Sequence, residues 1–206
     1  MSEAKHKFDR TIKRCINLIR CYQTTNENEK IIINKDLLRS AIVLAVAAID
    51  SYVTDIFSEY FIIYIKNYEI TEDLAEFIGK IGYTYKKSIE SLKLENPYCI
   101  IKTLLDQHLE KYTTQKFEII NNLFSYYGLS NIVENSAAMS KDETVLKTVS
   151  QMINRRHKIV HDGDYKNGII NDVDEDKTVL MIQKSQELIN CMEKIISNKF
   201  EKYLEK

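Results

Sequence analysis

The sequence predicts an all-α protein. Only 5 Gly and 1 Pro occur in 206 residues, too little turn chemistry for a β-sandwich, a small barrel or a Gly-rich dinucleotide fold. Hydrophobic residues make up 44% and charged residues 29% of the chain, the proportions of a globular protein rather than a disordered one. We therefore expect one helical domain over residues 1–206, built as an up-and-down helical bundle.

Apolar residues at helical spacing predict three long helices. The first is expected over residues 5–22, with Phe8 and Ile12 on its buried face. The second runs to about Lys66 and is apolar almost all round in its first two thirds, so neighbouring helices should surround it. The last begins near residues 174–176, whose acidic side chains suit the positive end of the helix dipole, and continues to about Leu204.

Residues 70–135 look like an insertion of extra helices into a minimal bundle. A helix should begin after Thr71, because two acids follow it directly. Two or three short helices should then fill the segment, with breaks near Pro97, Thr113 and Gly128.

A further helix is expected from residue 140 to about Val160. Ser140 and Glu143 fit a capping box, in which each side chain satisfies a backbone N–H group near the other. A polar loop with Gly163 and Gly168 follows.

Net charge and hydropathy indicate the cellular compartment of the protein and the kinds of partner it can bind. The net charge of -1 excludes a surface that is cationic throughout, although residues 1–20 hold six Lys or Arg against two acids. That basic face is either solvated or contacts phosphate. The longest apolar run, Ala41–Ile49, is nine residues, whereas a membrane span needs about 20. With no signal-peptide core at the N-terminus, we expect a cytoplasmic protein without membrane contact.

Cysteine usage agrees with that compartment. Cys15, Cys21, Cys99 and Cys191 are scattered, with no spacing typical of a zinc site. We expect them to be reduced, buried, small apolar side chains.

Charged residues interrupt two of the predicted apolar stripes. Arg156 continues the stripe formed by Val149 and Met152, and Asp50 lies within the stripe of the second helix. Burying an unpaired charge in such a position is unfavourable in free energy. We expect Asp50 to orient Arg156 or His161; the alternative is a buried ion pair that only fixes helix register.

Arg156 and His161 suit metal-free cleavage of RNA. An imidazole can take the proton of a ribose 2′-hydroxyl or protonate a leaving oxygen. A guanidinium can hold a phosphate by two parallel hydrogen bonds and stabilise charge that develops on it. Internal transesterification would then yield a 2′,3′-cyclic phosphate and a 5′-hydroxyl, with no cofactor.

The segment Arg155-Arg156-His157-Lys158-Ile159-Val160-His161 resembles the Arg-x4–6-His signature of the HEPN superfamily. The variant it is most similar to is the stand-alone RiboL-PSP-HEPN group. The resemblance implies a helical bundle that forms a homodimer, with one composite ribonuclease site, often in toxin–antitoxin or anti-phage systems. It implies Arg156, His161 and Asp50 as catalytic residues, Arg155, His157 and Lys158 as contacts to RNA, and a cognate antitoxin or regulatory protein as a possible partner.

Two other functions are open at this point. Some members of the superfamily have lost catalysis, so the chain can instead be a scaffold that binds RNA or a protein. A metal site at His157 and His161 is disfavoured, since the position of a zinc protease's general base is held by Lys158. Tyr60, Tyr64 and Tyr68 recur at helical spacing and are expected in the core or an interface rather than on RNA.

Overall fold

The computed structural model describes residues 1–24, 34–112, 114 and 116–204. Its helices and strands, in chain order, are α1 (Glu3–Thr24), α2 (Lys35–Asn67), α3 (Glu72–Lys80), α4 (Tyr85–Ser91), α5 (Cys99–Leu109), α6 (Phe117–Ser125), α7 (Ile132–Ser140), α8 (Val145–Asp162), β1 (Tyr165–Lys166), β2 (Ile169–Ile170) and α9 (Glu175–Leu204). The prediction of an all-α fold is confirmed; within the described residues, the only strands form one small antiparallel hairpin.

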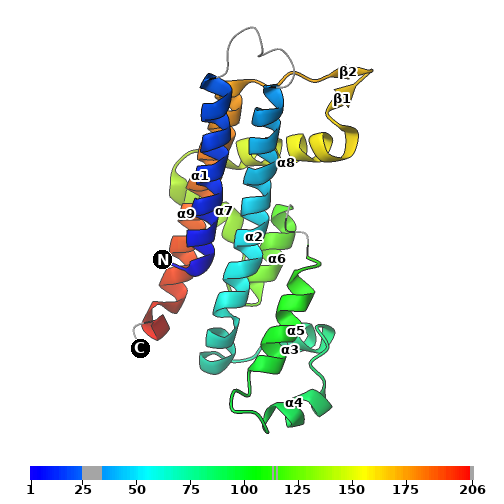
Figure 1. Cartoon of the computed structure of the whole chain (residues 1–206). Helices are drawn as coiled ribbons and strands as arrows, with labels where there is room; N and C mark the ends of the chain where they lie inside the picture. The colour runs from blue at the N-terminus through cyan, green and yellow to red at the C-terminus, as the bar shows by residue number, and fades with distance from the viewer. Residues whose placement is uncertain (25–33, 113, 115, 205–206) are drawn as a thin grey trace.

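The long helices α1, α2 and α9 lie side by side along the molecule (Figure 1). Helix α1 runs in one direction, and α2 and α9 run back in the other. Helix α8 crosses them near one end of the bundle, and α3, α4 and α5 extend the other end. The β-hairpin projects beside the C-terminal end of α8, far from α4.

Helix α2 is the centre of the core, as its all-round apolar sequence predicted. Its buried side chains share one apolar core with Phe8, Ile12 and Cys15 of α1 and with Ile189 and Met192 of α9. Among the described residues, α2 is also the one helix long and apolar enough to cross a membrane, but 56% of its most apolar stretch is buried by its neighbours. The packing thus accounts for its apolar composition.

Aromatic side chains join α2 to the inserted helices and to α9. Tyr127 stacks on Phe57 with ring centroids 4.4 Å apart and on Tyr64 at 4.9 Å. Phe200 of α9 stacks on Tyr60 at 4.6 Å. Tyr60 and Tyr64 are buried, which confirms that this tyrosine series serves the core.

The N-terminus of α1 is capped by carboxylates from other helices. Glu193 of α9 accepts hydrogen bonds from the Ser2 N–H at 2.7 Å and from the Tyr52 hydroxyl at 3.0 Å. Glu59 of α2 accepts from the backbone N–H groups of Glu3 and Ala4. Negative charge at a helix N-terminus is favourable because it satisfies free N–H groups and complements the helix dipole. The three long helices are therefore linked by polar contacts as well as by apolar packing.

The inserted segment follows the predicted turn signals. The Thr71 hydroxyl accepts from the Leu74 N–H and caps α3. Pro97 lies between α4 and α5, and Gly128, at φ +67°, lies between α6 and α7. The break expected at Thr113 lies outside the described residues.

The predicted capping box at Ser140 is wrong. Ser140 is the last residue of α7, and its hydroxyl donates to the Ala137 carbonyl. Helix α8 starts five residues later, after a turn in which the Asp142 carboxylate accepts from the Thr144 N–H and hydroxyl. Asp142 also pairs with Lys184 of α9, and these hydrogen bonds hold the pKa of its carboxyl well below the usual range. Asp142 therefore fixes the turn before α8, and the side chain of the N-cap residue Thr144 makes no capping hydrogen bond.

The cysteine prediction holds for two of the four side chains. Cys15 and Cys191 are buried, whereas Cys21 and Cys99 are exposed. Burial raises the pKa of the Cys15 thiol to about 11, so this thiol stays protonated at neutral pH.

Candidate functional site at the end of helix α8

Two histidines lie together on the exposed face of the last turns of α8. His157 and His161 are four residues apart, and their ring centroids are 4.3 Å apart. Both side chains are exposed, as is Lys158 between them. Residues four apart share one helix face, so this pairing follows directly from the helix continuing through Asp162. The structure thus joins the predicted catalytic histidine to His157, which was expected only as a secondary contact.

Arg156 lies on a different side of the same helix. It is half-buried, in agreement with its place in the apolar stripe of α8. Five positions of an α-helix turn the side-chain direction by about 140°. Since α8 ends after His161 rather than before it, Arg156 and His161 of one chain leave the helix in divergent directions.

The Asp50 carboxylate binds the segment between α5 and α6. Its Oδ1 accepts a 2.8 Å hydrogen bond from the Thr114 N–H and another from the Thr114 hydroxyl. Thr114 is fully buried in the segment between α5 and α6. A buried N–H outside a helix needs an acceptor, and the half-buried carboxylate of α2 supplies it. These contacts of the carboxylate attach the inserted segment to α2, and the prediction that Asp50 orients Arg156 or His161 stays a prediction.

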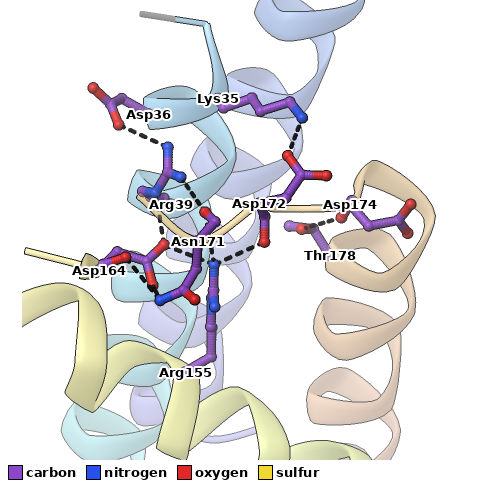
Figure 2. Close-up of polar contacts among 9 residues, drawn as sticks. All are labelled: Lys35, Asp36, Arg39, Arg155, Asp164, Asn171, Asp172, Asp174 and Thr178. Atoms are coloured by element: carbon purple, nitrogen blue, oxygen red, sulfur yellow. Dashed lines mark hydrogen bonds and ion pairs between the residues drawn. The ribbon is translucent and has the colours of Figure 1, made fainter. Parts of the chain in front are cut away.

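Arg155, expected as a contact to RNA, belongs to a buried ion network (Figure 2). Its Nη2 lies 2.7 Å from Oδ2 of Asp164, a carboxylate with no exposed surface. Nε of Arg39, on α2, lies 2.8 Å from the same oxygen. One buried carboxylate is therefore shared by guanidinium groups from α2 and α8. A buried charge requires such pairing, so Arg155 stabilises the buried Asp164 carboxylate, and its contact to RNA stays a prediction.

The same network holds the chain that leaves the hairpin. Arg39 Nη2 donates to the Asn171 carbonyl at 2.6 Å, and Arg155 Nη2 donates to the Asp172 carbonyl at 2.9 Å. The Asp172 carboxylate in turn pairs with Lys35 (Figure 2). The polar segment after α8 is consequently fixed to both helices rather than being a loose loop.

Two grooves open beside α8. One, of about 370 Å³, is lined by His157 and Ile153 of α8 and by Lys116 and Phe117 at the start of α6. The other, of about 530 Å³, is largely apolar; it is lined by Leu18, Asp36, Arg39, Ser40, Val43, Leu44, Ala47, Ile159 and Gly163. His157 thus borders a groove that also holds the basic side chain of Lys116, and the other groove offers an apolar surface beside the same helix.

In the part of the chain that the structure describes, no three His, Cys, Asp or Glu side chains gather in a way that could hold a metal ion. His157 and His161 have Lys158 beside them rather than a third ligand. The chemistry available at this site is that of imidazole, guanidinium and ammonium groups.

Sequence reasoning missed Arg39 and Asp164 entirely. Asp164 belongs to the polar loop expected after residue 160, and Arg39 lies in the expected second helix. The one available signal was an arginine in an otherwise apolar stretch of the second helix, which required a buried carboxylate that the sequence did not locate.

A comparison with known protein families matches the RiboL-PSP-HEPN model over residues 9–198. The chain belongs to the RiboL-PSP-HEPN family. The match runs through residues 70–135, so the short helices lie within the span of the family model. Membership of this HEPN family points to a nuclease or another RNA-related function.

Curated relatives include two ATP phosphoribosyltransferase regulatory subunits from Clostridium botulinum. The protein of strain 657 / Type Ba4 is 36% identical over 69 residues, which is 34% of this chain and 16% of the relative. That of strain Langeland / NCTC 10281 / Type F is 30% identical over 96 residues, or 44% of this chain and 23% of the relative. The chain thus spans less than a quarter of either relative. No solved structure gives a significant match.

Proposed function

We propose that the protein is a metal-independent endoribonuclease that cleaves RNA by internal transesterification at a site completed by a second copy of the chain. The observation that carries this proposal is the exposed His157–His161 pair, with ring centroids 4.3 Å apart, on the helix that also holds Arg156. The family match supports an RNA substrate. In this role the protein would act in the cytoplasm, under the control of an antitoxin or another regulatory protein.

The reaction requires two proton-transfer groups, which two neighbouring imidazoles can supply and one imidazole cannot easily supply alone. Transesterification needs a base that removes the 2′-hydroxyl proton and an acid that protonates the departing 5′-oxygen. The 2′-oxygen attacks phosphorus, the bond from phosphorus to the 5′-oxygen breaks, and one proton passes through each group. His161 is the first of these groups, and His157 or the second copy's histidine is the other.

Arg156 is the phosphate clamp of the proposed site. A guanidinium that is partly removed from water binds a phosphate more strongly and needs little reorganisation as charge develops. Because Arg156 and His161 of one chain diverge by about 140°, a second chain must bring the complementary group. The divergence therefore favours a composite site over one within a single chain.

The apolar groove beside α8 is the surface we assign to the second copy. Of its lining residues, Ala47 is exposed and Val43 and Leu44 are half-buried; Val160, next in the chain to the lining residue Ile159, is 49% exposed. Apolar groups left in water at this end of the bundle gain by association. An interface here would bring the C-terminal turns of two α8 helices together.

The test uses a 5′-labelled RNA incubated with the purified protein in the presence of EDTA. We expect cleavage that yields 2′,3′-cyclic phosphate ends and is unaffected by the chelator. Arg156→Ala and His161→Ala should each reduce the rate by about 100-fold or more. His6→Ala, an exposed histidine on α1, is the matched control and should cleave normally.

Two outcomes would overturn the proposal. Cleavage that survives both Arg156→Ala and His161→Ala would remove these side chains from the mechanism, and cleavage abolished by EDTA would show a metal-dependent reaction. A wild-type protein that binds RNA without cutting it would instead establish the alternative function, a catalytically silent RNA-binding scaffold.

A further inference from the structure

The hairpin after α8 exposes apolar side chains beside the proposed site. Tyr165 of β1 is 55% exposed and Ile169 of β2 is 73% exposed. The strands pair Tyr165 with Ile170 and Lys166 with Ile169. A two-stranded hairpin of this length buries too little surface to be stable alone. The residues on either side of the hairpin must therefore stabilise its conformation.

Four residues with left-handed backbone conformations shape the hairpin. Gly163 and Asp164 precede its first strand, and Asn167 and Gly168 lie between the strands. Asn167 and Gly168, at φ 53° and 79°, form the two-residue turn, a conformation that Asn-Gly adopts readily. Gly163 ends α8 at φ 60°, and a Cβ atom there would lie 3.3 Å from Cδ2 of Tyr165. The Tyr165 ring therefore lies against the backbone of Gly163, at the end of the helix that carries His161.

The base of the hairpin is clamped to the bundle. Asp164 is fully buried at φ 64°, its N–H donates to the Lys158 carbonyl, and its carbonyl accepts from the Asn171 N–H at 2.8 Å. Its carboxylate holds Arg39 and Arg155 (Figure 2). Burying a carboxylate costs desolvation free energy, which its two guanidinium partners offset. Here the buried carboxylate fixes Asp164, the residue just before the exposed Tyr165 ring.

We propose that Tyr165 is a stacking platform for an unpaired RNA base next to the cleaved phosphodiester, so that the substrate class is single-stranded RNA. This inference rests on the proposed function. Aromatic rings stack on bases of single strands, whereas bases of a duplex are already stacked on one another. A ring held in place before binding loses little conformational entropy. Lys158, in the last turns of α8, and Lys166, next to Tyr165 in β1, are exposed and suit phosphates of a bound strand.

The test measures binding by fluorescence anisotropy in the His161→Ala background, so that no RNA is consumed. The probes are a labelled single-stranded RNA of mixed sequence and the same strand annealed into a duplex. Tyr165→Ala should weaken binding of the single strand by about ten-fold or more, and Tyr165→Phe, which keeps the ring, should bind like the parent. Binding of the duplex should change less than two-fold in either variant.

Tyr85→Ala is the matched control. Tyr85 is 83% exposed on α4, at the opposite end of the bundle (Figure 1), and its loss should leave binding of both probes unchanged. Equal binding by Tyr165→Ala and its parent would overturn the inference. So would a Tyr165→Phe variant as weak as Tyr165→Ala, because the hydroxyl rather than the ring would then be required.

Light scattering on the same samples separates a protein contact from an RNA contact. If Tyr165→Ala halves the molar mass in solution, and its affinity loss equals that of another monomeric variant, the hairpin is a subunit contact and the inference fails. The outcome is also distinct from that of the cleavage test. A wild type that cuts no RNA, combined with ring-dependent binding of single strands, would remove the proposed function and keep this inference.

Discussion

Oδ2 of Asp164 lies 2.8 Å from Nε of Arg39, a residue 125 positions earlier in the chain. The carboxylate has no exposed surface, and the arginine is 6% exposed. Together with Arg155 this pair joins α2, the end of α8 and the hairpin (Figure 2). The end of α8 that carries the candidate site is therefore held by Arg39 and Asp164, two residues outside the motif segment.

Replacing Asp164 with Ala should destabilise the protein severely. The buried Arg39 and the half-buried Arg155 would both lose the carboxylate they share. Breaking a buried pair by removing one partner costs about 3–5 kcal/mol. Urea denaturation followed by far-UV circular dichroism measures this loss in the free energy of unfolding.

Asp36→Ala is the control for that experiment. Asp36 pairs with the same arginine, at 3.0 Å, but its side chain is 65% exposed. An exposed pair contributes about 0–1 kcal/mol, so the variant should unfold close to the wild-type midpoint. Similar losses in Asp36→Ala and Asp164→Ala would show that burial of the network does not matter.

Replacing Asp50 should loosen the inserted segment. The carboxylate accepts two hydrogen bonds from the fully buried Thr114, and Asp50→Ala would leave a buried donor unsatisfied at a cost of about 1–3 kcal/mol. Asp50→Asn keeps an oxygen acceptor and should recover much of the stability. Thermal denaturation of the two variants checks this, and an Asp50→Ala protein as stable as the wild type would contradict it.

The long helices could be predicted from the sequence because their signals are local. The stripes of α1 and α9 and the all-round apolar surface of α2 report burial directly through residue spacing. The same holds for His157 and His161, whose four-residue spacing brings them together on any continuous helix.

The partners of the buried charges could not be predicted in this way. Asp50 bonds a residue 64 positions away, and Arg39 bonds one 125 positions away; neither distance leaves a periodic signal. Of the two adjacent arginines, Arg155 reaches Asp164 only because Gly163 and Asp164 take left-handed conformations that turn the chain back. Tertiary contacts of this kind follow from the fold, not from a local pattern.

A charge in the apolar groove should separate the proposed dimer. Ala47 is exposed on α2 and lines this groove, so Ala47→Glu would place a carboxylate in the middle of the interface at a cost that favours the monomer. We expect light scattering to show half the wild-type mass. The cleavage rate should fall by about 100-fold or more, because the acid–base and phosphate-binding groups of the composite site would be separated.

Gln183→Glu is the matched control for that variant. Gln183 is exposed and lines a separate groove, between α1 and α9, so it introduces the same charge on another face. It should leave both the mass and the cleavage rate unchanged. A dimeric Ala47→Glu protein that cleaves RNA normally would place the second copy elsewhere.

High pH should unfold the protein through its buried tyrosines. Burial, and then the adjacent Glu193, raises the pKa of Tyr52 well above its usual value, and burial, with a smaller contribution from Tyr64, does the same for Tyr127. Above pH 10 these groups ionise only in the unfolded chain, so each lowers the free energy of unfolding by about 1.4 kcal/mol per pH unit. Their favourable contribution is complete below pH 10 and is lost as the pH rises further. Tyr52→Phe removes one such group; urea denaturation from pH 8 to 11 should show a shallower decline than in the wild type, and parallel declines would refute this account.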